Sequence, residues 1–128
     1  MKLEFDTDKI GITYKKGWGF EQMLITTELY CSKLLCFTKK DNKFSYHFHK
    51  DKDETWKVLQ GYFVLKIKDT NTGKDYSDYL LKPNDIYRVY PGIIHQLIAL
   101  EDNSIILETS TEDKFTDNYR IEPGDSQK

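Results

Sequence analysis

The chain has 128 residues, of which 38% are hydrophobic and 31% charged, and its formal net charge at pH 7 is −2. This length suits one domain that can bury a core without the help of disulfides or metal. The near-neutral charge gives no electrostatic case for binding nucleic acid or an anionic membrane, so we expect neither partner. Residues Met1–Asp8 lack the apolar stretch of a signal peptide, and no apolar run reaches the length of a membrane helix. The expected location is therefore the cytoplasm, where Cys31 and Cys36 would be ordinary reduced strand residues.

Short apolar runs alternate with turn signals along most of the chain, a pattern typical of an all-β protein. The abundance of Tyr and Phe also favours strands. The segment 69–74 is the clearest hairpin loop, because Asn71 and Gly73 tolerate positive φ. The expected strands, in chain order, are Phe20–Thr27, Tyr30–Thr38, Phe44–Lys50, Thr55–Leu59, Tyr62–Lys68, Tyr76–Leu81, Ile86–Tyr90, Ile94–Leu100 and Ser104–Thr109.

The remaining segments are expected to contribute little regular structure. No stretch has a sustained helical period, so we expect no helix beyond one short turn within Thr111–Asn118. The opening Met1–Ile10 is expected to form an edge strand or to be loose, and the polar tail Glu122–Lys128 to fray. Residues 1–128 are expected to form one domain, with its core in residues 16–110.

The histidines carry the strongest chemical signal, because the chain has only three: His47, His49 and His95. Two residues apart on a strand, His47 and His49 would point to the same face. Glu54 follows where the next strand should begin. His95 lies on an apolar strand, where an unpaired imidazole would be costly to bury. A divalent transition metal ion bound by all four side chains would give the His95 imidazole a partner, and Zn, Fe, Mn or Ni suits such ligands. A packing role for the histidines stays open on this pattern alone.

Two longer patterns around these residues resemble the motifs of the cupin superfamily. The first motif, G-x5-H-x-H-x3-4-E-x6-G, is matched by Asp41, His47, His49, Glu54 and Gly61. Only the first position departs from it, and Asp is a residue that tolerates positive φ.

The second motif, G-x5-P-x-G-x2-H-x3-N, is matched at Gly92 and His95, whereas Tyr90 and Ala99 depart from it. Asn84 stands at the first glycine and again tolerates the left-handed region. The resemblance implies a double-stranded β-helix, or jelly-roll barrel, with one metal ion inside it. It also implies that His47, His49, Glu54 and His95 are the ligands, and that the protein is a homodimer.

The flanking residues are similar to those of type II phosphomannose isomerase cupin domains. The similar stretches are Gly17-Trp18-Gly19-Phe20-Glu21, Glu54-Thr55-Trp56 and, more loosely, Asp117-Asn118-Tyr119-Arg120. Ser45 and Gly17 depart from that family's Gln and Pro. The resemblance implies a metal-dependent isomerase of a sugar or sugar phosphate, with zinc as the usual ion and mannose 6-phosphate as the model substrate. Two alternatives stay open: an iron-dependent dioxygenase, and a non-catalytic module that binds a carbohydrate or other small ligand.

Two further residues are candidates for catalysis. Glu108 is in phase with Ser104 and Ile106 on an expected strand, and an inward carboxylate there would suit proton transfer. Otherwise it is an exposed strand residue. Arg88 would bind a phosphate group in a bidentate manner or form a surface salt bridge. The alternating charges of Lys50–Asp53 are expected to be solvated loop residues.

Overall fold

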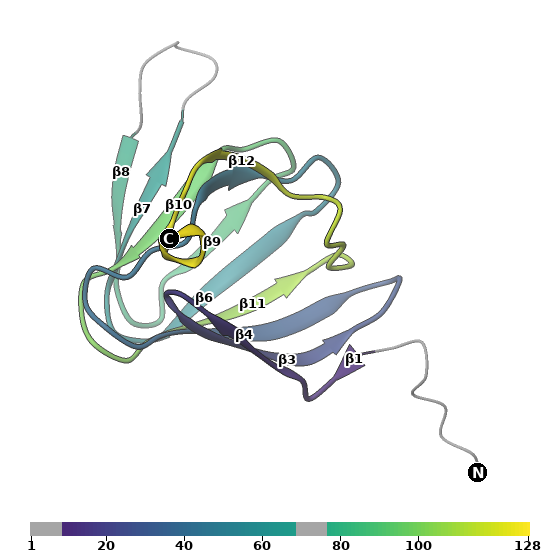
Figure 1. Cartoon of the computed structure of the whole chain (residues 1–128), viewed down its shortest axis with the longest axis horizontal. Coiled ribbons are helices and arrows are strands. Elements are labelled where there is room, and N and C mark those ends of the chain that lie inside the picture. The colour runs from purple at the N-terminus through teal and green to yellow at the C-terminus, as the bar shows by residue number, and fades with distance from the viewer. Residues whose placement is uncertain (1–8, 69–76) are drawn as a thin grey trace.

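The computed structural model describes residues 9–68 and 77–128, and in these ranges the regular secondary structure is almost entirely β-strand, which confirms the expected fold class (Figure 1). No helix in these ranges is long and apolar enough to cross a membrane. The strands are β1 Lys9–Ile10, β2 Thr13–Lys16, β3 Gly19–Thr26, β4 Cys31–Phe37, β5 Tyr46–Phe48, β6 Glu54–Gln60, β7 Phe63–Ile67, β8 Ser77–Leu81, β9 Ile86–Val89, β10 His95–Ala99, β11 Ser104–Ser110 and β12 Tyr119–Glu122, followed by the 3₁₀ turn η1 Asp125–Gln127.

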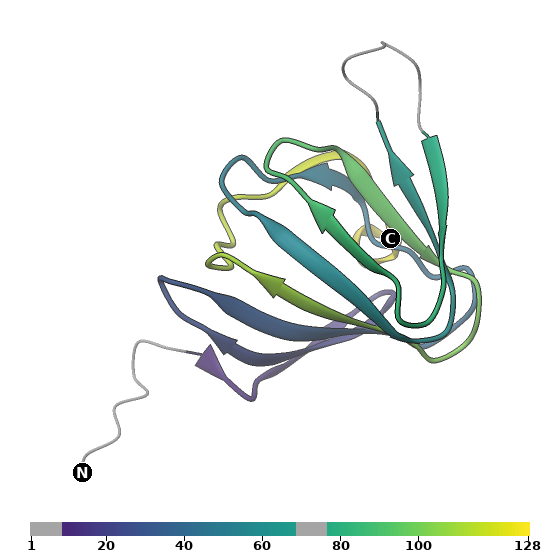
Figure 2. The same ribbon diagram turned by 180° about the vertical axis from the view of Figure 1, so that it is seen from behind.

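The strands form two antiparallel sheets that face each other as a jelly roll (Figure 2). The first sheet has the order β1-β3-β4-β11-β6-β9, with β2 paired to the outside of β3. The second sheet has the order β12-β5-β10-β7-β8. Because successive strand residues point to opposite sides, each strand sends every second side chain into the space between the sheets.

All nine expected strands correspond to observed ones, from β3 to β11. The expected loop 69–74 lies outside the described residues, but the strands that flank it, β7 and β8, pair antiparallel. Lys9 and Ile10 pair with β3, as an edge strand would, and residues 1–8 lie outside the described ranges. The expected helical turn in Thr111–Asn118 was wrong, because that segment is an irregular connection between β11 and β12.

The polar tail does not fray as expected, because hydrogen bonds from its backbone and its side chains hold it against the barrel. The Asp125 N–H donates to the Lys43 carbonyl at 3.0 Å, and the Lys43 N–H donates to an Asp125 carboxylate oxygen at 2.8 Å. The Gly17 N–H donates to the Ser126 hydroxyl. A side chain at Gly124 would come within 2.4 Å of the Ser45 nitrogen, so only glycine fits this contact.

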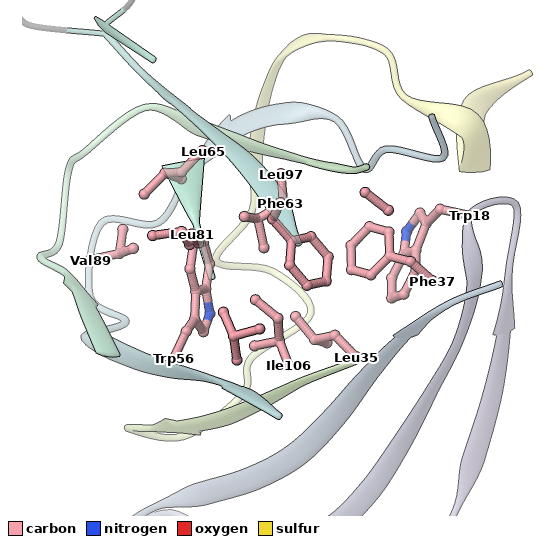
Figure 3. Close-up of a cluster of buried hydrophobic side chains, with 12 residues drawn as sticks. Trp18, Leu35, Phe37, Trp56, Phe63, Leu65, Leu81, Val89, Leu97 and Ile106 are labelled. Carbon is pink, nitrogen blue, oxygen red and sulfur yellow. The ribbon is translucent and has the colours of Figure 1, made fainter. Parts of the chain in front are cut away.

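The apolar core fills one end of the space between the sheets (Figure 3). Trp18 stacks on Phe37 with ring centroids 4.5 Å apart, and Phe37 meets Phe63 edge to face at 5.1 Å. Leu35 and Ile106 from the first sheet join the cluster, as does Leu97 from the second. All of these side chains are at most 3% exposed, so both sheets depend on this contact for their packing.

The turns at the two motif starts have the backbone conformation that the sequence predicts. Asp41 and Asn84 stand where the cupin motifs have glycine, and their φ angles are 71° and 74°. Gly61, at the end of the first motif, has φ 78°, and a side chain there would come within 2.9 Å of the Ser104 backbone. The glycine is therefore required by both conformation and space.

Candidate metal centre

Three histidines converge at the other end of the space between the sheets. His47 and His95 are direct cross-strand partners on β5 and β10, so their side chains share the inward face. His49 follows β5 and lies on the same side, with its ring centroid 4.9 Å from that of His47. One ring nitrogen from each histidine lies within 4.8 Å of the other two.

Glu54 completes the group from the opposite sheet. It is the first residue of β6 and is 2% exposed. Its Oε1 lies 3.3 Å from Nε2 of His95, and its Oε2 lies 3.7 Å from Nε2 of His49. The structure therefore brings together all four residues that the sequence predicts as metal ligands.

Backbone carbonyl groups orient all three imidazole rings. Nδ1 of His47 lies 2.7 Å from the Ser45 carbonyl oxygen, and Nδ1 of His95 lies 2.8 Å from that of Ile93. Nδ1 of His49 contacts the Asp117 carbonyl oxygen. Because a carbonyl oxygen only accepts hydrogen bonds, each Nδ1 must carry the proton. In the neutral rings, each Nε2 then keeps a lone pair directed toward the shared space, as in histidines that bind metals.

The unpaired atoms of the centre provide a test of whether a metal ion fits. Nε2 of His95 and Oε2 of Glu54 are buried and have no hydrogen bond. With the His95 proton on Nδ1, its Nε2 lone pair faces Oε1 of Glu54 at 3.3 Å. Two facing acceptors repel each other unless a cation or a second proton lies between them. The donor set therefore fits a transition metal ion.

The ionisation of these groups also favours a metal. Burial, reinforced by repulsion from the neighbouring imidazoles, lowers the pKa of His47 well below its ordinary value. Burial likewise lowers the pKa of His49. Burial opposes ionisation of Glu54, but Lys52 and the histidines outweigh it and lower the Glu54 pKa to about 2. Neutral imidazoles and an ionised carboxylate are the forms that bind metal ions.

A buried network of ion pairs adjoins the histidines. Lys52 Nζ lies 2.9 Å from Glu108 Oε2, 3.1 Å from Asp113 Oδ1 and 3.5 Å from Glu54 Oε2. Lys33 Nζ lies 3.2 Å from Glu21 and 3.3 Å from Asp113. Lys52 is only 4% exposed, so the expectation that it is a solvated loop charge was wrong. Partners more than 50 residues away bury it, and local sequence gives no sign of them.

The charges of this network do not balance by themselves. Four carboxylates, from Glu21, Glu54, Glu108 and Asp113, surround only two ammonium groups, from Lys33 and Lys52. Burial opposes the charge on Glu108 and on Asp113, but the two lysines outweigh it and lower the pKa of both carboxyls. Glu54 and Glu108 are buried, and Glu21 and Asp113 are half-buried. The network therefore has two more carboxylates than ammonium groups, an excess that one divalent cation would neutralise.

The structure places the two catalytic candidates differently. Glu108 points inward, is 3% exposed and accepts a hydrogen bond from the indole of Trp56 at 3.2 Å. Arg88 is exposed on the outer face, opposite Thr55 in the neighbouring strand, and its Nε donates to Asp53 at 3.0 Å. The structure therefore brings Glu108 to the centre, but it does not bring Arg88 there.

Asp117 is a residue of the centre for which the sequence supplies only a loose family resemblance. Its carboxylate accepts the consecutive backbone N–H groups of residues 50, 51 and 52, at 2.7, 3.1 and 3.0 Å. Its own carbonyl contacts Nδ1 of His49. One residue thus fixes both the His49 ring and the loop that carries Lys52.

A cavity of about 280 Å³ connects the centre to solvent. His47, His49, Glu54 and Glu108 line its interior, and Trp18 and Phe44 form part of its wall. Side chains of β2, β12 and η1 also line the cavity, and because they are exposed or half-buried they lie on its solvent side, which we call the mouth. The volume is close to the lower end of small-molecule pockets, so a ligand of about monosaccharide size fits.

Comparison with solved structures gives several matches to this fold. A capsular polysaccharide assembling protein, CapF from Staphylococcus aureus, matches with TM-score 0.73 and 18% identity over 87% of this chain. Oxalate decarboxylase from Bacillus subtilis matches with TM-score 0.75 and 15% identity over 94% of this chain. An RmlC-like cupin from Shewanella frigidimarina matches with TM-score 0.63 and 18% identity, over 76% of this chain and 78% of that one.

This chain has the cupin fold. The expected jelly-roll arrangement is thereby confirmed. The chain spans 32% of the length of CapF and 33% of that of oxalate decarboxylase, so it corresponds to one part of each. No protein-family model and no curated protein sequence matches this cupin-fold chain.

Proposed function

We propose that this chain binds one divalent transition metal ion through His47, His49, His95 and Glu54. The observation that carries the proposal is the convergence of three oriented Nε2 lone pairs and one carboxylate on a single buried space. The excess of carboxylates over ammonium groups around Lys33 and Lys52 supports a divalent ion. Zinc is the first expectation, and iron, manganese or nickel suits the same ligands.

The reaction we propose is the isomerisation of a sugar or sugar phosphate, with mannose 6-phosphate as the model substrate. A bound metal would supply polarisation of the carbonyl and hydroxyl oxygens of the sugar. The cavity volume and the likeness to a capsular polysaccharide assembling protein support a carbohydrate ligand. Homodimer formation and a cytoplasmic location stay predictions.

Glu108 is the base that the chain offers for this reaction. Its carboxylate lines the cavity, and Lys33 and Lys52 outweigh its burial to keep its pKa low, so it is ionised at neutral pH and able to accept a proton. Trp56 and Lys52 hold its two oxygens in place, at 3.2 and 2.9 Å. Arg88 has no part in this proposal, because its ion pair with Asp53 lies on the outer face.

The test is an assay of metal-reconstituted protein with mannose 6-phosphate and fructose 6-phosphate in D₂O. We expect interconversion with deuterium exchange at the carbon next to the carbonyl group. Glu108→Gln should reduce the rate about 100-fold or more. Glu101→Gln, at an exposed loop residue, is the matched control and should leave the rate unchanged.

Other outcomes would contradict the isomerase proposal and identify its alternatives. Oxygen consumption by the iron form alone would indicate a dioxygenase. Saturable binding of a sugar, without turnover in any metal form, would indicate a carbohydrate-binding module.

A further inference from the structure

The acidic and basic residues that line the cavity differ in whether they have partners. The acidic ones, Glu21, Glu54, Glu108 and Asp113, are each within 4 Å of a buried lysine, Lys33 or Lys52. The other charged side chains of the lining, apart from the two buried lysines, are all cations. They are Lys9, Lys16, Lys114 and Arg120. Lys9, Lys114 and Arg120 are exposed and Lys16 is half-buried, so these cations lie on the solvent side of the buried Glu54 and Glu108. The chain has a net negative charge, but the mouth of its cavity is cationic.

Strand register directs two of these cations into the space between the sheets. Arg120 on β12 lies directly opposite His47 on β5, so it projects from the same face as the metal-site histidines. Lys16 on β2 pairs with Gly19 on β3, and Gly19 pairs with Phe37 on β4. Lys16 is therefore on the same face of this sheet as the core residue Phe37. The two cations therefore approach the cavity from the edge strands of opposing sheets.

Neither of these two side chains is neutralised within the described part of the chain. No carboxylate among residues 9–68 and 77–128 forms an ion pair with Lys16 or Arg120. Lys114, by contrast, lies 4.0 Å from Glu112. Because Lys16 and Arg120 have no carboxylate partner in these ranges, their charges are available to a ligand. The tail also fixes the position of β2, because the Ser126 hydroxyl accepts the N–H of Gly17, the residue after Lys16.

We propose that the cavity binds a small anion whose phosphate or carboxylate group is held at the mouth by Arg120 and Lys16. The planar guanidinium group of Arg120 suits bidentate contact with either group, and Lys16 adds a point charge from the other side. The rest of the ligand extends toward the histidines, and this part of the inference rests on the proposed metal site. The cavity volume limits that ligand to about one monosaccharide or a comparable organic acid.

The experiment measures binding of inorganic phosphate and of acetate by metal-loaded protein and by metal-free protein, using titration calorimetry at low ionic strength. The test variant is Lys16→Gln/Arg120→Gln. The matched control is Lys15→Gln/Lys57→Gln, which removes two positive charges from exposed residues that do not line the cavity. Metal content is measured on the same samples, so a failed metal site is recognised separately.

We expect wild type and control to bind one anion per chain with similar affinity, and the test variant to bind it at least about tenfold more weakly. Preference for phosphate or for acetate would identify the anionic group. The proposal would be overturned by phosphate and acetate binding within twofold of wild type in the test variant, which would place the anion elsewhere, for example on the metal. Absence of saturable binding of both anions to the wild-type protein would also overturn it.

Discussion

The two ends of the barrel interior are built from the same strands but have opposite chemistry. On β4, β6 and β11, the inward residues of one end are Leu35, Val58 and Ile106, and the inward residues of the other end are Lys33, Glu54 and Glu108. The strand β10 repeats the contrast, with Leu97 at the apolar end and His95 at the polar end. Both ends are equally buried, so burial alone does not distinguish packing from chemistry.

The difference shows what each end contributes to the protein. Burying apolar side chains stabilises the fold, whereas burying charges and imidazoles costs free energy unless they are paired. A barrel closed for stability alone would carry the apolar pattern throughout. The polar end is therefore best understood as a binding site that the apolar end supports. Substitutions at the two ends should then affect different measurements.

The largest effect on stability is expected at the apolar end. Phe63→Ala removes a fully buried ring that meets Phe37 edge to face, and it should lower the free energy of unfolding by about 3–5 kcal/mol. Urea denaturation measures the loss. Metal content per folded chain should stay unchanged, and its loss would show that the two ends are not separate in function.

At the polar end, His95→Leu should have the opposite effect, with a small change in stability and a large loss of bound metal. The change removes one hydrogen bond to the Ile93 carbonyl, but it also removes the Nε2 lone pair that faces Glu54. The free energy of unfolding of metal-free protein should therefore change by less than about 2 kcal/mol. Bound metal, measured after dialysis against trace zinc, should nearly disappear. Retained metal with a stability loss as large as that of Phe63→Ala would indicate a packing histidine.

Acid should destabilise the polar end first. The unfolded chain binds protons on His47 and His49 below about pH 6.5, whereas the folded protein keeps both rings neutral because burial lowers their pKa values. The unfolded state then binds more protons, so the stability of metal-free protein should fall as pH drops below 6.5. Denaturation midpoints between pH 5 and 8 measure this slope. His47→Leu should flatten it, and an unchanged slope would contradict the neutral state of His47.

A smaller effect is expected from the residue that orients His49. Asp117→Asn weakens the contacts to the three backbone N–H groups of residues 50–52, and it should reduce metal affinity about tenfold. Asp125→Asn is the control, because that carboxylate also accepts a backbone N–H but lies in the tail. Competition with a chromophoric chelator measures both affinities. Equal metal affinity in the two variants would show that Asp117 does not support the metal centre.

The sequence predicts those features that depend on local pattern. The alternation of apolar and polar residues, together with the turn residues, identifies nine strands. The motif spacing predicts that His47, His49, Glu54 and His95 share one site, and the structure brings them together. The strands β2 and β12 and the docked tail were missed, because short polar segments gain their order only from distant backbone partners.

The burial of Lys33 and Lys52 was beyond prediction for a similar reason. Glu54 on β6 is the one carboxylate partner close in sequence, two residues after Lys52. The other partners come from β3, β11 and the connection that follows β11, and only the folded barrel brings these together. The outward direction of Arg88 was not predictable either, because it follows from the register in which β9 pairs with β6, where Arg88 lies opposite Thr55.

The central claim is that the polar end holds one metal ion, and elemental analysis of untagged protein tests it most directly. Inductively coupled plasma mass spectrometry should find about one transition metal ion per chain in the wild type, and almost none in His47→Ala and Glu54→Ala. The identity of the ion would then direct the choice between isomerisation and oxygen chemistry. Wild-type protein without stoichiometric metal, even after anaerobic reconstitution with zinc, iron, manganese and nickel, would contradict the account.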